Sequence, residues 1–124
     1  GRVARADLFV TGKLWNTDHG DAATVRAACL RSLAALGLDY FDLYLVHWPL
    51  PSGAAKGTPL AVTWEAMESL VADGHARSIG VSNFGPARLE ALCAGARIRP
   101  AVNQVECHPG WRNEAVRKAC ADRG

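Results

Sequence analysis

Four short groups of polar and aromatic residues stand out, because each one follows an apolar run of the chain. The groups are Lys13 with Trp15, His47 with Trp48, Ser82 with Asn83, and Gln104 with Glu106. A lysine and a histidine can move protons and stabilise negative charge on an oxygen. Amides and hydroxyls orient polar rings, and tryptophans line small-molecule pockets. This set suits the polarisation of a carbonyl group beside a planar ring that is held in place.

Several of these residues also have a purely structural explanation. A lone histidine such as His47 often packs in a core or caps an element. Ser82 and Asn83 precede Pro86 and could cap a helix that begins there. Gln104 is harder to explain in this way, because an amide inside a strand that is buried on both faces needs partners, and a ligand is one way to supply them.

The charged and aromatic members have alternatives of the same kind. A lysine at a strand end is usually a solvated charge, but Lys13 lies between Thr11 and Trp15 among apolar neighbours, where an ammonium group needs a partner. Trp15 and Trp48 could fill a core, or they could form the apolar wall of a pocket. The residue types therefore favour a site, while each residue alone does not establish one.

Four strand-like runs carry these groups at their carboxyl ends. The runs cover residues 7–15, 41–48, 76–84 and 100–108, and they are short and apolar on both faces at their centres. Helical patterns separate or follow them over residues 21–37, 58–74, 85–95 and 113–124. The residues expected on the buried helix faces are Val25, Cys29, Leu33 and Leu36, then Trp64, Met67, Leu70 and Val71, then Leu89, Leu92 and Cys93.

This alternation predicts an α/β fold with a parallel sheet and right-handed crossovers. The fold would be a doubly wound open sheet or part of a (β/α)8 TIM barrel. In both folds the site lies at the carboxyl ends of the strands. Because the four groups recur once in each strand-helix unit, we expect them to share one rim.

Composition narrows the classes of partner. The chain has 124 residues, 49% of them hydrophobic and 21% charged, with a net charge of +2. This balance is typical of one globular domain and gives no footprint for nucleic acid or an anionic membrane, so a small-molecule partner is expected. No run is long and apolar enough to cross a bilayer, and there is no signal-peptide core at the start, so a cytoplasmic protein is expected.

The four cysteines contain no CxxC pair, and reduced thiols are the simplest interpretation. A zinc site that uses Cys107 and His108 is conceivable. Two adjacent ligands without a second pair at metal-like spacing are a weak signal, so no metal site is expected.

Four ordered stretches resemble a known family. "LFVTGKLWNTDH", "LDYFDLYLVHWPLP", "ARSIGVSNF" and "AVNQVECHPGW", which lie between residues 8 and 111, are similar to consecutive signatures of the aldo-keto reductases. Their sequences are especially similar to those of the plant NADP(H)-dependent members. The resemblance implies a (β/α)8 barrel, in which NADPH lies across the carboxyl-end rim and gives a hydride to an aldehyde or ketone while a tyrosine protonates the oxygen.

The resemblance also implies roles for individual residues. Lys13 would lower the pKa of the tyrosine acid, and His47 would orient and polarise the substrate carbonyl. The nicotinamide carboxamide would be bound by Ser82, Asn83 and Gln104, and the pocket walls would be Trp15 and Trp48. Gly12 stands where the family commonly has serine, which we expect to loosen the backbone that aims Lys13. The connection from residue 49 to residue 64 is shorter than in plant members.

The chain is expected to form only part of such a barrel. A barrel of this kind needs about 200 residues or more, and residues 1–124 resemble its third to sixth units. The tyrosine acid and an aspartate would lie in units upstream. Tyr44 should point to the opposite strand face from His47, and Tyr40 comes earlier still, so we expect no reductase activity from this chain alone. The two open sheet edges should favour aggregation or pairing, whereas the complete barrel should be a monomer.

Two alternatives accompany the reductase interpretation. The first is a non-catalytic nicotinamide-binding or regulatory protein of the same fold. The second is an unrelated barrel hydrolase that uses Cys107, His108 or Asp42, which is disfavoured because Asp42 lies deep in its strand.

Overall fold

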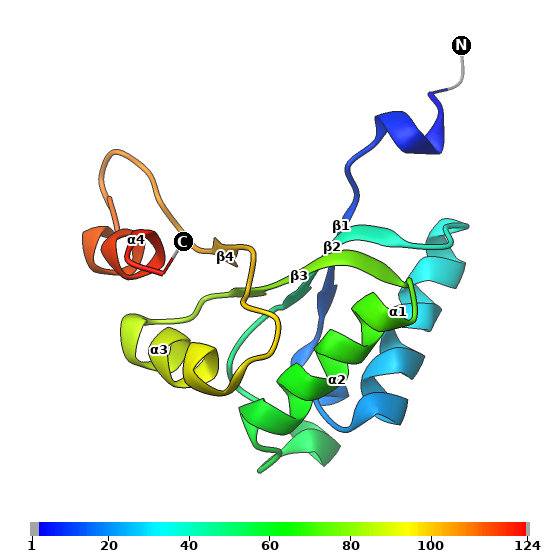
Figure 1. The fold of residues 1–124 in the computed structure, drawn as a ribbon, viewed down its shortest axis with the longest axis horizontal. Coiled ribbons are helices and arrows are strands. Elements are labelled where there is room, and N and C mark those ends of the chain that lie inside the picture. The colour runs from blue at the N-terminus through cyan, green and yellow to red at the C-terminus, as the bar shows by residue number, and fades with distance from the viewer. Residues whose placement is uncertain (1–2, 124) are drawn as a thin grey trace.

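Four strand-helix units follow one another in the computed structural model, which describes residues 3–123. The strands are β1 (Thr11–Leu14), β2 (Phe41–Val46), β3 (Ala76–Ser82) and β4 (Asn103–Gln104), and the helices are α1 (Ala22–Leu36), α2 (Leu60–Ala72), α3 (Pro86–Gly95) and α4 (Glu114–Ala121). Short 3-10 helices form at η1 (Arg5–Asp7), η2 (Asn16–Asp18) and η3 (Gly53–Ala55). Every strand pair is parallel, and the sheet order is β1-β2-β3-β4 (Figure 1). The expected four-unit partial barrel is confirmed.

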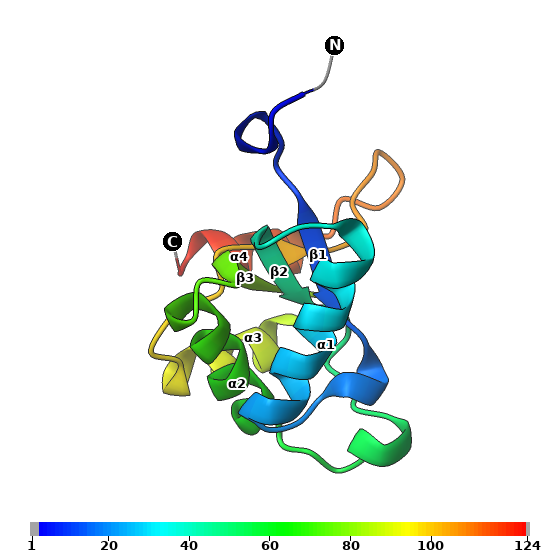
Figure 2. The same ribbon diagram turned by 90° about the vertical axis from the view of Figure 1, so that its right-hand side faces the viewer.

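The helices α1, α2 and α3 lie on one side of the sheet (Figure 2). The core between these layers contains Leu14, Tyr44 and Val46 from the strands, with Leu33 and Met67 from the helices. Burial of these side chains is the main favourable term in holding the layers together. The sheet is therefore anchored through its helix-covered face.

Burial differs between the central and the edge strands. All six residues of β2 are buried, and most of β3 is buried as well. The edge strands β1 and β4 are partly exposed, and the runs expected to be strands over 7–15 and 100–108 shorten to Thr11–Leu14 and Asn103–Gln104. Apolar burial on both faces was therefore a wrong expectation for the edges. An edge strand has a hydrogen-bonding neighbour on one side only. It therefore forms fewer ladder hydrogen bonds, and more of its residues are exposed to solvent.

Helix α1 begins and ends where the sequence indicates. The Asp21 carboxylate accepts a hydrogen bond from the Thr24 amide at 2.9 Å, and Gly37 ends the helix with a φ of 65°. Leu36, however, is 58% exposed, so its expected place on the buried face was wrong. The Leu38 amide donates to the Leu33 carbonyl after the Gly37 turn, and Leu38 packs against the core in place of Leu36.

Helices α3 and α4 begin where the sequence predicts, but neither start has a side-chain capping hydrogen bond. Gly85 is the N-cap of α3, so the alternative in which Ser82 or Asn83 caps this helix is wrong. Asn113 is the N-cap of α4, but its amide donates to the Glu106 carbonyl instead of capping the helix. Helix α4 ends at Ala121, and its expected limit at residue 124 lies outside the described residues.

A charged cluster closes the amino end of the sheet. Asp42 of β2 accepts hydrogen bonds from the Val10 amide at 2.9 Å, from Arg5 at 2.8 Å and from Arg77 at 3.4 Å. The Arg5 and Arg77 guanidinium groups also lie over the Tyr40 ring, 4.0 and 4.2 Å from its centroid. The Val10 amide, followed by Arg5, lowers the pKa of Asp42. Asp42 is thus tied into the fold and far along the strand from the carboxyl rim.

Candidate active site

Lys13 and His47 meet at the carboxyl end of β1 and β2. Lys13 pairs with Leu45 in the parallel register, and the His47 amide donates to the Leu14 carbonyl at 3.1 Å. Side chains alternate along a strand, so Lys13, Leu45 and His47 share the sheet face opposite Tyr44. Lys13 is half-buried, and no described residue forms an ion pair or hydrogen bond with its ammonium group. The two side chains expected to act together are therefore neighbours.

The surroundings of His47 favour the neutral form of its imidazole. Burial lowers its pKa, and the positive charge of Lys13 lowers it further. The Trp15 ring lies edge-on at a centroid distance of 5.0 Å, and the Trp48 ring is roughly parallel at 6.4 Å. Trp15 is 50% exposed and Trp48 39%, so both are available to a ligand and neither is core. A neutral imidazole with an open ring edge can donate one hydrogen bond to a substrate oxygen.

Hydrogen bonds join the ends of β2, β3 and β4 beside this pair. The Asn83 amide group donates to the His47 carbonyl at 3.0 Å and to Ser82 Oγ at 3.1 Å. Ser82 Oγ in turn donates to the Gln104 carbonyl at 2.8 Å. Asn83 adopts a φ of 61°, a left-handed conformation that asparagine tolerates better than most residues. The structure thus brings Ser82, Asn83 and Gln104 together next to His47.

The side chain of Gln104 lies on the surface. It is exposed, and no described residue bonds to its amide. The expectation that this amide is buried on both faces was therefore wrong, because β4 is a two-residue edge strand. Its donors and acceptors remain available to a ligand.

Neither tyrosine of the chain lies beside Lys13. Tyr44 pairs with Gly12, is fully buried on the helix side of the sheet, and stacks on Phe41 at 5.1 Å. Burial raises the pKa of its hydroxyl. Tyr40 lies at the amino end, where the Arg5 and Arg77 guanidinium groups pack on its ring. The expected orientation of Tyr44, away from the face of His47, is confirmed.

Gly12 has a packing reason that the sequence does not reveal. A Cβ atom at this position would lie 2.7 Å from the Phe41 ring and 3.0 Å from the Tyr44 ring. The space beside Gly12 is thus filled by aromatic carbon, where a looser backbone was expected. His19 is a residue that the sequence pattern did not single out, although it ends the stretch "LFVTGKLWNTDH".

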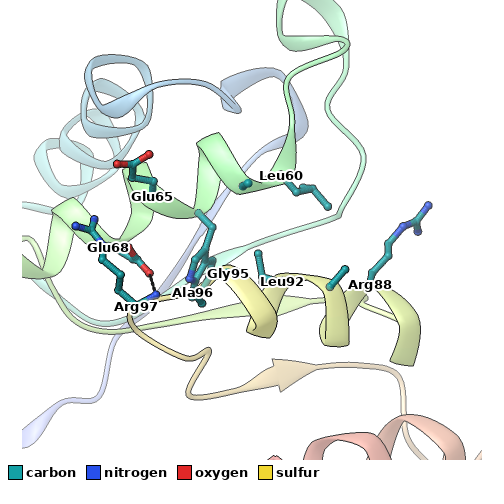
Figure 3. A pocket seen from close by; sticks show the side chains of 11 residues that line it. Leu60, Glu65, Glu68, Arg88, Leu92, Gly95, Ala96 and Arg97 are labelled. Carbon is teal, nitrogen blue, oxygen red and sulfur yellow. Dashed lines mark hydrogen bonds and ion pairs between the residues drawn. The ribbon is translucent and has the colours of Figure 1, made fainter.

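A large cavity lies away from these residues, between α2 and α3 (Figure 3). Its volume is about 540 Å³, and its walls include Leu60, Trp64 and Leu92. Polar groups at one end are already paired, since the Glu68 carboxylate accepts from the Arg97 backbone amide at 2.7 Å and from its side chain at 2.8 Å. The cavity therefore shares no residue with the rim.

Residues 3–123 contain no cluster of three or more acidic, histidine or cysteine side chains that could hold a metal ion. His108 bonds to Glu106 at 3.0 Å and accepts from the Gly110 amide at 3.2 Å, while the Cys107 thiol donates to the Arg112 carbonyl at 3.5 Å. All four cysteines are free thiols. No helix in this part of the chain combines the length and apolarity needed to cross a membrane.

Known proteins have sequences similar to that of the whole chain. The sequence profile of the Aldo/keto reductase family matches residues 1–124. A glyoxal reductase from Bacillus subtilis is 48% identical over 122 residues, covering 98% of this chain and 42% of the relative. An aldo-keto reductase from Arabidopsis thaliana is 47% identical over 133 residues, covering 100% of this chain and 42% of that protein. The similarity is thus as strong to a bacterial relative as to a plant one.

Solved structures show the same arrangement. The aldose reductase of Giardia lamblia superposes with a TM-score of 0.91 at 41% identity, over 98% of this chain and 45% of that structure. A Bombyx mori aldo-keto reductase in complex with NADP also gives 0.91 at 41% identity, over 98% of this chain and 40% of its own length. The chain therefore spans about two fifths of the length of the proteins it matches.

Proposed function

Because this chain belongs to the aldo/keto reductase family, we propose that it forms the third to sixth strand-helix units of an NADP(H)-dependent reductase of aldehydes and ketones. The observation that carries this proposal is the pair Lys13 and His47. These side chains lie on adjacent parallel strands, on one face, at the carboxyl end of the sheet, and have no partner among the described residues. Unpaired ionisable groups at this end of a barrel sheet are typical of an active site.

His47 would act on the substrate oxygen. Its neutral imidazole donates one N–H to the carbonyl and favours the negative charge that develops there during reduction. Trp15 and Trp48 flank the imidazole and present apolar surface to the rest of a small carbonyl substrate. The natural substrate would be an aldehyde or ketone small enough to enter between these rings.

Lys13 would act through a general acid. Its ammonium group favours the anionic form of a neighbouring phenol and lowers the pKa of that phenol, so a proton passes more readily to the reduced oxygen. Tyr40 and Tyr44 both lie elsewhere, so the tyrosine and its aspartate partner would come from barrel units beyond residues 3–123. The isolated chain is accordingly proposed to be inactive.

The amides fit a nicotinamide carboxamide, which has one acceptor oxygen and two donor hydrogens. The Gln104 amide is exposed and unpaired among the described residues, while Ser82 and the Asn83 N–H groups position Asn83 beside His47. Gln104 and the Asn83 oxygen would therefore contact the carboxamide, with Ser82 completing the cofactor site. Bound NADPH would supply the hydride.

The proposal also covers the partners, the oligomeric state and the cell compartment of the complete protein. Its partners would be a small carbonyl compound and NADP(H), without nucleic acid or membrane, and the complete barrel would be a monomer. The four free thiols favour the cytoplasm, where disulfides rarely persist.

The test is NADPH oxidation by the full-length protein with short-chain and aromatic aldehydes. We expect Lys13→Met and His47→Ala each to lower kcat by roughly 100-fold or more while the melting temperature changes little. Lys118→Met, at an exposed lysine of α4, and His75→Ala, before β3, are matched controls away from the rim and should retain activity.

Three outcomes discriminate between the readings. Near-wild-type turnover by either rim variant contradicts the assigned roles. If the wild-type protein quenches NADPH fluorescence, which shows binding, but does not oxidise NADPH with any aldehyde, the non-catalytic alternative is supported. Turnover by residues 1–124 alone contradicts the proposed need for a tyrosine from another unit.

A further inference from the structure

Two connections at the carboxyl rim carry the aromatic residues of the site. The first, residues 15–21, follows β1 and begins with Trp15. The second, residues 47–59, follows β2 and begins with His47 and Trp48. Loops are usually the mobile parts of a barrel, so the direction of these side chains depends on what holds the two connections.

His19 lies between them. It ends η2 in the first connection and is only 2% exposed, in contrast to the exposed tryptophans. Its Nδ1 is 3.3 Å from Oγ1 of Thr63, a fully buried residue of α2, and the backbone of Trp48 lies next to the ring. The imidazole therefore touches both the helix behind the rim and the backbone that carries the Trp48 indole.

Further contacts join the same two connections. The Ser52 amide donates to the Asn16 carbonyl at 2.9 Å, and Gly53 packs close to the Thr17 methyl group. The buried Nε2 of His19 has no hydrogen bond within the described residues. Among the described residues, His19 is the one imidazole that is fully buried, and burying a ring nitrogen without a hydrogen bond costs free energy that the surrounding packing must offset.

The buried position of His19 favours a neutral ring. Burial lowers the pKa of His19, although the Trp48 backbone and Asp18 oppose that change. Asp18, the acidic residue next to it in the same connection, pairs with Arg31 of α1. A neutral imidazole has one donor and one acceptor; Nδ1 meets the Thr63 hydroxyl, while Nε2 makes no hydrogen bond within the described residues.

We propose that His19 is a positioning residue, which fixes the backbone at Trp48 against α2 and thereby sets how His47 and Trp48 face the substrate. It does not touch the substrate or the cofactor. The link to substrate binding rests on the proposed reductase function, whereas the link to the backbone at residues 47–52 does not.

The test compares full-length wild-type protein with His19→Leu, which preserves bulk and removes both ring nitrogens. We expect the KM for an aldehyde to rise roughly tenfold, because small misplacements of positioning groups are costly, while the Kd for NADPH stays within about twofold. Amide exchange over residues 47–52 should accelerate. His19→Gln, which restores a donor and an acceptor, should recover most of both effects, and His75→Leu should cause neither.

Thr63→Val provides a second measurement if His19→Leu does not fold. It removes the hydroxyl partner and should accelerate exchange over residues 47–52 in the same direction, with a smaller rise in KM. Unchanged exchange and KM in the folded His19 variant, or in Thr63→Val, would overturn the proposal. If the wild-type protein reduces no carbonyl compound, the proposed function fails, and the exchange measurement still decides the role of His19.

Discussion

The two ends of β2 hold ionisable residues in opposite conditions. At the amino end, Asp42 accepts from the Val10 amide and two arginines, and the same guanidinium groups pack on the Tyr40 ring. At the carboxyl end, the His47 ring packs beside Trp15 and Trp48, and Lys13 has no bonding partner among residues 3–123. The polar groups at the amino end of β2 are thus hydrogen-bonded, whereas the ionisable side chains at its carboxyl end have no hydrogen-bond partner among the described residues.

The difference shows how this sheet divides stability from chemistry. A charge that is already paired contributes to the fold but has little capacity left for a ligand. An unpaired, half-buried charge contributes little to the fold and retains its capacity for a substrate. The same division between a stabilising amino end and a functional carboxyl end is general in barrels.

The largest expected effect on stability comes from Asp42→Ala. This change leaves Arg5 and the Val10 amide without their acceptor, so the melting temperature of the full-length protein should fall by roughly 10 °C. The KM and kcat of the protein that remains folded should not change. Asp39→Ala, at an exposed aspartate nearby, is the control and should be neutral.

The pH dependence of this cluster has a defined sign. Because the pKa of Asp42 is lowered in the folded state, its contribution is present above the ordinary carboxyl pKa of about 4 and is lost as pH falls through the folded pKa. Acid unfolding curves should therefore converge for wild type and Asp42→Ala at low pH. A constant difference at every pH, or a loss of activity without a loss of stability, would break the contrast between the two ends.

A smaller loss is expected from Gly12→Ser, directly before Lys13. The new side chain would meet the buried Phe41 ring, and such overpacking costs about 1–3 kcal/mol. Urea unfolding of the full-length protein measures the loss. Phe41→Leu in the same chain should restore part of it, and Gly85→Ser, where the space is open, should be neutral or favourable. Equal stability of the Gly12 and Gly85 variants would show that the rings move aside.

The smallest effect is expected from Tyr44→Phe. The Tyr44 hydroxyl is buried without a hydrogen-bond partner in the described structure, so its removal should change the free energy of unfolding by less than about 1 kcal/mol, toward greater stability. The kcat for aldehyde reduction should be unchanged, because this hydroxyl lies on the helix side. A large fall in kcat would place a tyrosine of this chain in the reaction and contradict the assignment of the open face as the site.

Much of the fold and part of the site could be predicted from local patterns. The alternation of short apolar runs with helical stripes predicts the four units, and Gly37 and Gly85 mark helix ends. Parallel pairing and strict side-chain alternation then predict that Lys13 and His47 share one face. The helices and strands depend on residues close together in the sequence, so composition and period predict them, and the parallel pairing follows from their alternation.

Other features could not be predicted, because they depend on packing between distant segments. The exposure of Gln104 follows from the shortness of an edge strand, and the close fit at Gly12 follows from where the Phe41 ring settles. The place of Leu38 in the core follows from the turn at Gly37.

By itself, the sequence determined the order of the elements, the strand face of each rim residue and the resemblance to a reductase family. Only the tertiary structure decided which polar groups are satisfied: Asp42 by arginines far along the chain, the His47 carbonyl by Asn83, and His19 beside Thr63. Hydrogen bonds depend on distance and angle between segments that fold together, and a residue's type shows what it can bond to but not which partner it meets.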